Sequence, residues 1–160
     1  MELLHLYISP GHNFRGHQGG APGQHPMHEM DQIRCLAGRG IDGDRYFDHK
    51  VDFKGQITFF ADEVHRALCE QSGQSEKPPS VFRRNIITRG ADLEALIGRE
   101  FEVQGVRFLG VESCEPCYWM DQAFGPGAEA ALQGRGGLRA RILTDGMLKV
   151  TRQDWKSERG

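Results

Sequence analysis

The sequence has no apolar run of the roughly 20 residues that a membrane-spanning helix needs, and it has no excess of charge of either sign. A formal net charge of -2 over 160 residues argues against general nucleic-acid binding, because proteins of that class usually carry a clear basic excess. The first residues, Met1–His5, show no basic segment followed by an apolar stretch, so we expect no signal peptide. These features predict a cytoplasmic protein that binds neither nucleic acid nor membrane.

Cysteine is scarce, and its pattern restricts the chemistry. The thiols are Cys35, Cys69, Cys114 and Cys117, and the last two form a single Cys-x-x-Cys. A structural zinc site would need further ligands, for which the loop histidines are candidates. A redox pair and two buried small thiols are the other interpretations. Because Glu115-Pro116 favours a rigid, exposed bend, we expect Cys117 to be available to a ligand.

Glycine is abundant, with 21 residues, and favours a turn-rich β fold over a helical bundle. Alternating and β-branched segments predict about seven or eight short strands, and apolar spacing predicts about two or three short helices. The strands are expected at 3–8, 30–36, 56–60, 85–88, 100–103, 106–111, 138–143 and 147–150, and the helices at 62–69, 92–97 and 127–132. We expect the last two strands to form a hairpin across Asp145-Gly146. Strands this short, joined by glycine turns, indicate a barrel.

A single domain over residues 1–160 is expected, because each half of the chain alone would bury only a marginal core. Residues 10–28 are rich in glycine, proline and histidine and predict a long loop, and long loops in small domains usually have a function. The polar tail at 153–160 is expected to be frayed.

Three segments place arginine beside glycine, asparagine or aspartate, an arrangement that suits the binding of an anion. Arg83-Arg84-Asn85 offers charged forks and an amide for a phosphate or a ring with donors and acceptors. Arg135–Arg141 contains paired glycines, whose backbone amides can approach an anion closely. In Asp42–Arg45, Asp44 could hold Arg45 in position. Each segment is also compatible with an ordinary solvated turn, so none of them decides the function alone.

Five segments, taken in their order along the chain, make the pattern specific. They are Gly40–Arg45, Arg83–Leu93, Leu96–Phe101, Glu112–Cys117 and Arg135–Ala140. In this order they resemble the MOSC domain, named from the molybdenum cofactor sulfurase C-terminus, over about residues 3–150. The resemblance implies a mostly β fold, with a MOSC-type β-barrel and a few short helices in a single MOSC domain.

The resemblance also implies a site for the molybdenum cofactor, molybdopterin. In the amidoxime-reducing relatives the second thiol of a Cys-x-x-Cys is the molybdenum ligand, which corresponds to Cys117 here. The implied cofactor-binding residues are Arg45, Gln56, Arg83, Asn85, Arg135 and Arg139, with Gln56 acting through the backbone of its strand. Asp121, which follows the thiol, is a candidate for proton transfer or for capping a turn. At the level of the family, pyridoxal phosphate binding and sulfur transfer by the cysteine are also implied.

The sequence departs from the longer relatives, and the departures shape the expected function. It contains no aminotransferase-like domain, no ferredoxin-like cysteine cluster and no N-terminal β-barrel half of the amidoxime reducers. We therefore expect a reductase of N-hydroxylated small molecules that takes electrons from a flavin or iron–sulfur partner, with loop 12–28 replacing part of the pocket. One alternative is a module that carries sulfur or the cofactor to a receiving enzyme without turnover. A zinc-binding structural protein is the third interpretation.

Overall fold

The chain folds into two sheets and a small group of helices in a computed structural model that describes residues 1–15, 17, 19–74 and 77–151. The strands are β1 (Glu2–Ile8), β2 (His28–Met30), β3 (Gln32–Leu36), β4 (Gly40–Ile41), β5 (Ile57–Ala61), β6 (Ile86–Arg89), β7 (Glu100–Val103), β8 (Val106–Ser113), β9 (Leu138–Ile142) and β10 (Gly146–Lys149). The helices are α1 (Asp62–Ser72), α2 (Trp119–Ala123) and α3 (Ala128–Ala131), with 3₁₀ turns η1 (Pro79–Phe82) and η2 (Glu94–Leu96). The predicted mostly β fold is confirmed, whereas the predicted polar tail lies outside the described residues.

The larger sheet contains seven strands in the order β2-β1-β6-β5-β9-β8-β7, and the smaller one contains β10-β3-β4. Among the named strands of the described residues, β5 and β6 pair in parallel and the other pairings are antiparallel. Within the part of the chain that the structure describes, no pairing joins the edge strands β2 and β7. The sheets are therefore open, and the barrel expected from the strand pattern is not closed by hydrogen bonds.

The expected hairpin of the last two strands is wrong, because β9 and β10 belong to different sheets. β9 pairs with β5 and β8, and β10 pairs with β3. The backbone N–H of Leu143 donates to the carbonyl of Arg107 at 2.8 Å. The carboxylate of Asp145 accepts from the backbone N–H of Ala37 at 2.7 Å. These long-range bonds direct the chain out of the first sheet and into the second, although Asp-Gly is locally a hairpin signal.

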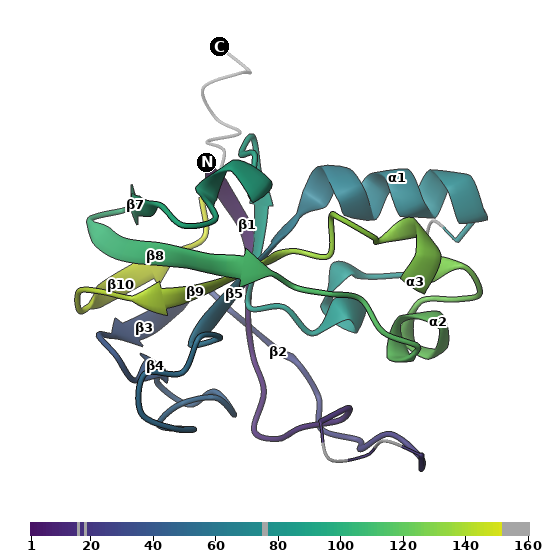
Figure 1. Cartoon of the computed structure of the whole chain (residues 1–160), viewed down its shortest axis with the longest axis horizontal. Helices are drawn as coiled ribbons and strands as arrows, with labels where there is room; N and C mark the ends of the chain where they lie inside the picture. Colours follow the sequence, from purple (N-terminus) through teal and green to yellow (C-terminus); the bar gives the residue numbers. More distant parts are fainter. Residues whose placement is uncertain (16, 18, 75–76, 152–160) are drawn as a thin grey trace.

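The central strands are buried on both faces, and their alternating side chains feed two apolar clusters. On β5, Phe59 packs into the cluster between the two sheets, whereas Phe60 packs into the cluster beneath the helices. On β6, Ile86 and Ile87 divide in the same way. Burying a side chain of this size stabilises the fold by about 2–3 kcal/mol. In Figure 1 the helices gather at one end of the molecule and the smaller sheet lies at the other.

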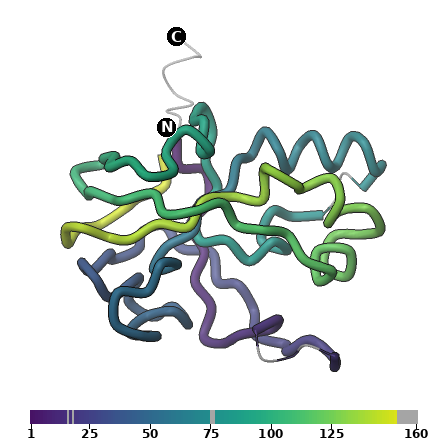
Figure 2. Tube along the Cα trace, viewed as in Figure 1, coloured from purple at the N-terminus to yellow at the C-terminus, as the bar shows by residue number. Residues whose placement is uncertain are grey.

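A long connection links β1 to β2, and we call its described residues between 9 and 27 the histidine loop. Figure 2 shows this connection, in purple, at the bottom of the view, away from α1. Reciprocal bonds between Asn13 and His25 close it: the amide Nδ2 donates to the carbonyl at 3.0 Å, and Oδ1 accepts from the backbone N–H at 2.7 Å. The loop predicted from composition is therefore an organised segment.

Candidate functional site

Cys117 lies in the wall of a cavity of about 260 Å³, which we call the arginine cavity. The arginines that share this wall are Arg15, Arg45, Arg83, Arg84 and Arg139. They come from the histidine loop, the segment after β4, the segment before β6, and β9. The fold therefore brings together cationic side chains that lie far apart in the sequence.

The two cysteines of the Cys-x-x-Cys occupy different environments. Cys114 is buried, and its backbone N–H donates to the carbonyl of Gly137 at 2.7 Å. A side chain at Gly136 would collide with the backbone there, since its Cβ would lie 2.2 Å from the Cys114 carbonyl oxygen. Cys117 is exposed, and its carbonyl accepts the N–H of Met120 at the start of α2. The backbone of Cys114 packs closely against that of Gly136 and Gly137, and Cys117 is the accessible thiol of the pair.

Arg83 is buried and holds the histidine loop. Its Nη1 donates to the carbonyl of His25 at 2.8 Å, and its Nη2 donates to Ser9 Oγ at 2.8 Å and to the carbonyl of Gly11 at 2.7 Å. Burial, and then the neighbouring Arg45, lower the pKa of Arg83 to about 10, so its side chain is charged at neutral pH. Its role in the structure is to clamp one wall of the arginine cavity.

Arg45 forms a buried ion pair with its neighbour, as the sequence allowed. Its Nη1 lies 3.1 Å from Asp44 Oδ1, and its Nη2 donates to the carbonyl of Arg83 at 3.0 Å. The Asp44 carboxylate also accepts the backbone N–H groups of Ser9 and Tyr46. Because removing one member of a buried pair leaves an uncompensated charge, this network fixes the relative position of the loop and the β4–β5 connection.

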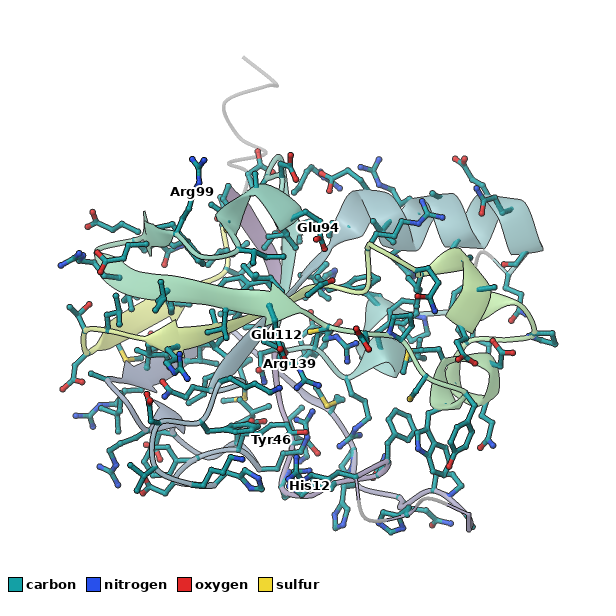
Figure 3. The ribbon with its side chains drawn as sticks, viewed as in Figure 1. His12, Tyr46, Glu94, Arg99, Glu112 and Arg139 are labelled. Atoms are coloured by element: carbon teal, nitrogen blue, oxygen red, sulfur yellow. The ribbon has the colours of Figure 1, made fainter. Side chains whose placement is uncertain are left out.

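Arg84 and Arg139 retain more hydrogen-bonding capacity for a ligand. Arg84 donates from Nε to the carbonyl of Gly136 and from Nη1 to the carbonyl of Phe82, and its Nη2 makes no hydrogen bond to another described residue. Arg139 bonds to another described residue through Nη1 alone, which lies 3.3 Å from Glu112 Oε1. Figure 3 shows the Glu112 and Arg139 side chains pointing toward one another. A hydrogen bond from Lys54 and the charge of Arg139 lower the pKa of Glu112.

The lining of the arginine cavity also contains apolar side chains. Phe14, from the histidine loop, stacks on Trp119 of α2 with ring centroids 5.2 Å apart and planes inclined by 18°. Trp119 is buried, and Met120 beside it also lines the cavity. The histidine loop lines this cavity with His12, Asn13 and Arg15 as well as Phe14.

Two predicted cofactor-binding residues have side chains committed to the sheet instead of the cavity. Gln56 is buried, and its Oε1 accepts the backbone N–H of Ile142 at 2.8 Å. Asn85 is buried, donates from Nδ2 to the carbonyl of Tyr7 at 3.1 Å, and accepts at Oδ1 from the N–H and hydroxyl of Thr58. These bonds join neighbouring strands, so neither side chain belongs to the cavity wall.

Asp121 and Arg135 are also placed away from the arginine cavity. Asp121 Oδ1 accepts the backbone N–H of Glu129 at 2.8 Å and so connects α2 to α3, which is the turn-capping alternative. Arg135 donates from Nε to the carbonyl of Ala131 at 2.8 Å and lines a different cavity. Of the predicted site residues, the structure therefore brings together Cys117, Arg45, Arg83 and Arg139.

The sequence interpretation did not assign His12, Arg15, Arg84 or Trp119 to the site. The composition of the 10–28 segment was the signal for the first two. Arg83 and Arg84 are adjacent in the sequence, which does not indicate that Arg83 holds the histidine loop whereas Arg84 is available to a ligand. Trp119 follows the Cys-x-x-Cys by two positions and belongs to α2, a helix too short to show a periodic pattern.

The fold and cavity define a mostly β protein that presents a thiol among arginines. The family model for the MOSC domain matches residues 42–153. Because this match covers more than half of the chain, the protein belongs to the MOSC domain family, which is associated with molybdenum cofactor binding.

Solved structures support the same fold. The YuaD protein from Bacillus subtilis aligns with a TM-score of 0.69 and 18% identity over 93% of this chain and 91% of that one. YiiM from Geobacillus stearothermophilus aligns with a TM-score of 0.67 and 11% identity over 92% and 70%. YiiM from Escherichia coli aligns with a TM-score of 0.64 and 16% identity over 96% and 71%. At these identities the likeness extends to the fold alone.

No curated protein matches this sequence. Among the described residues, no helix has the length and apolar character required to cross a membrane.

Proposed function

We propose that the protein binds the molybdenum cofactor in the arginine cavity, with the Cys117 thiolate as the ligand that the chain supplies to the metal. The observation that supports this proposal is the convergence of an accessible thiol and five arginines in the lining of one cavity. A soft thiolate suits molybdenum, and guanidinium forks suit a phosphate. The donor set therefore fits both ends of the cofactor, the metal and the anionic tail.

The described residues contain no group of three or more His, Cys, Asp and Glu side chains that could hold a metal ion. A metal at Cys117 must then take most of its ligands from a bound small molecule, as a pterin dithiolene would provide. Arg84 and Arg139 are the side chains we assign to the anionic part of the cofactor, because each keeps N–H groups that have no partner among the described residues. Arg83 and Arg45 act by holding the cavity wall.

The proposed activity is reduction of N-hydroxylated small molecules. When bound, the cofactor supplies two-electron oxygen-atom chemistry at molybdenum. The overall conversion consumes two electrons and two protons, breaks the N–O bond, and yields an amine and water. The electrons come from an external flavin or iron–sulfur protein. We take residues 1–160 to act as one MOSC domain in the cytoplasm, where free thiols such as Cys117 remain reduced.

A carrier function is the second candidate, favoured by the exposure of Cys117. An accessible thiol can pass a bound group or a persulfide sulfur to a receiving enzyme. Turnover separates the two candidates: a molybdenum-loaded protein that reduces hydroxylamines with an artificial electron donor is a reductase, and one that holds the metal without turnover is a carrier.

The test of the metal site is Cys117→Ser beside Cys114→Ser, each produced in cells that make the cofactor. Molybdenum per chain should be close to zero for Cys117→Ser and near the wild-type value for Cys114→Ser. Because Cys117 is exposed, Cys117→Ser should keep the fold, and a circular dichroism spectrum checks this. Full molybdenum in Cys117→Ser would show that the ligand assignment is wrong. Stoichiometric zinc in its place would favour the structural zinc protein.

A further inference from the structure

His12 lies in the wall of the arginine cavity but has no part in the cofactor binding proposed above. Its ring packs edge-on against Tyr46 with centroids 4.8 Å apart, and it lies 5.9 Å from the ring of His49. Within the described ranges, neither ring nitrogen of His12 makes a hydrogen bond. The imidazole is therefore positioned by ring packing, and its nitrogens remain available to a ligand. Figure 3 shows Tyr46 and His12 below Arg139 in the view.

The charges around His12 make its protonation sensitive to what fills the cavity. Burial, followed by Arg45, His49 and Arg15, lowers the pKa of His12, and Asp44 opposes this. An anion bound among these arginines would offset their positive charge at the imidazole. Binding should therefore raise the proton affinity of His12, so that the ring gains a proton when the cavity is filled.

Few groups in the cavity wall could exchange a proton with a ligand. The arginines hold their protons too tightly, and Cys117 is assigned to the metal. Glu115 and Tyr46 are the remaining titratable side chains in the wall. Of these types, imidazole is the one whose ordinary charge change lies closest to neutral pH. His12 is thus the strongest candidate, with Glu115 as the main competitor.

We propose that His12 is the residue that exchanges protons with a ligand bound in the arginine cavity. The reaction step rests on the proposed reductase function. As the N–O bond of an N-hydroxylated substrate breaks, the His12 imidazolium gives one proton to the leaving oxygen, and a hydronium ion from solvent supplies the second to the nitrogen. The external flavin or iron–sulfur donor supplies both electrons. The products are an amine and water, and neutral His12 regains its proton from solvent.

The first experiment measures protonation and needs no molybdenum. The Cε1–H signal of His12 is followed by NMR as pH is varied, with and without sulfate, an anion whose own charge stays constant over this range. Sodium chloride at equal ionic strength is the reference. The midpoint for His12 should lie below 6.5 in the free protein and move upward with sulfate. His28, which lies on β2 and does not line the cavity, is the internal control.

The second experiment measures turnover by His12→Gln, Glu115→Gln and His28→Gln. His12→Gln should lower kcat about 100-fold, in the range typical of a lost general acid. Its KM and molybdenum content should stay at wild-type values, and His28→Gln should leave kcat unchanged. A loss of rate in Glu115→Gln with full activity in His12→Gln would transfer the role to Glu115 and overturn the proposal.

The two experiments separate failure of this inference from failure of the proposed function. If the wild-type protein lacks molybdenum or turnover, the reductase function fails, and the NMR titration still decides whether His12 responds to a bound anion. A His12 midpoint that sulfate leaves unchanged overturns the inference whatever the turnover. A fall in the molybdenum content of His12→Gln also overturns it, because His12 would then support binding instead of proton transfer.

Discussion

The arginine cavity and a second cavity of about 400 Å³ share the segment 135–139 but differ in chemistry. The second cavity, which we call the apolar groove, is lined by Val64, Leu93 and Arg135, with carboxylates from Glu63, Asp92 and Glu94 at its rim. Figure 3 shows Glu94 on the other side of β8 from Arg139. One short motif thus supplies an arginine to a cationic, thiol-bearing cavity and another arginine to an apolar groove rimmed by carboxylates.

The difference shows that arginines close together in sequence need not serve one ligand. Gly136 and Gly137 carry the chain between the two cavities against the backbone of Cys114 and Phe59. A Cβ at Gly137 would lie 2.4 Å from the Phe59 carbonyl oxygen, and the φ of this glycine is 111°. The glycines therefore permit a close backbone approach that separates Arg135 from Arg139.

The largest effect on the free energy of unfolding is expected from adding a side chain at Gly136, between the two cavities. Gly136→Ala should lower the free energy of unfolding by roughly 4 kcal/mol, because its Cβ would overlap the Cys114 carbonyl oxygen and force the backbone to shift. Gly134→Ala is the control for the backbone conformation alone. Gly134 has a positive φ of 75°, which Gly136 does not have, and no atom lies within 4 Å of the added Cβ, so a cost of about 1 kcal/mol is expected. Urea denaturation measures both, and equal costs would mean that close approach at Gly136 is not required.

The next effect concerns Arg83, which clamps the wall of the arginine cavity and is not among the residues that line the apolar groove. Arg83→Gln should lower the free energy of unfolding by about 2 kcal/mol, because it leaves the buried Ser9 hydroxyl and the carbonyls of Gly11 and His25 without their charged donor. Hydrogen exchange should accelerate in the histidine loop and stay unchanged at Val64 and Leu93 in the groove. Faster exchange on both sides would contradict the clamp assignment.

The sequence predicted those parts of the fold that depend on local signals. The hairpin of β7 and β8 follows from alternating apolar residues around Gln104-Gly105, and the structure confirms it. The last hairpin failed because Arg107 and Ala37, both distant in sequence, bond to the turn. Helix α2 was not predicted, since packing of Trp119 in the core stabilises it instead of a periodic pattern.

The site was predictable as a set of segments but not as a set of side chains. The motifs identified which loops carry arginine, and Cys117, Arg45, Arg83 and Arg139 do meet. No local signal separates Arg83 from Arg84. The left-handed backbone at Arg83, with φ of 56°, coincides with a side chain bonded to the histidine loop, and this contact depends on tertiary structure.

A smaller effect tests whether anions bind in the arginine cavity and not in the apolar groove. Arg84→Gln and Arg139→Gln should each weaken sulfate binding about tenfold, equivalent to about 1.4 kcal/mol, because each removes a charge-assisted donor. Arg135→Gln should leave the affinity unchanged, since Arg135 lines the apolar groove. Isothermal titration calorimetry at constant ionic strength measures all three. Weaker binding by Arg135→Gln would break the distinction between the two cavities.

The smallest effect is a pH dependence of stability on the arginine-cavity side. Burial, as the largest cause, lowers the pKa of His12 and of His49 below 6.5 in the folded chain. As pH falls below 6.5, the unfolded chain therefore binds protons before the folded chain does, and the free energy of unfolding should decrease. The decrease should end once pH is below the folded pKa values, where both states are protonated.

The variant His49→Gln should reduce the slope of unfolding free energy against pH in this window, whereas His28→Gln should keep it. Denaturant titrations at several pH values below 6.5 measure the slope for each. No histidine occurs among the described residues that line the apolar groove, so the groove should not contribute to the difference between these variants. An unchanged slope in His49→Gln would indicate that the His49 imidazole binds protons as readily in the folded chain as in the unfolded chain. Burial and positive charge beside the arginine cavity would then have no effect on the protonation of this histidine.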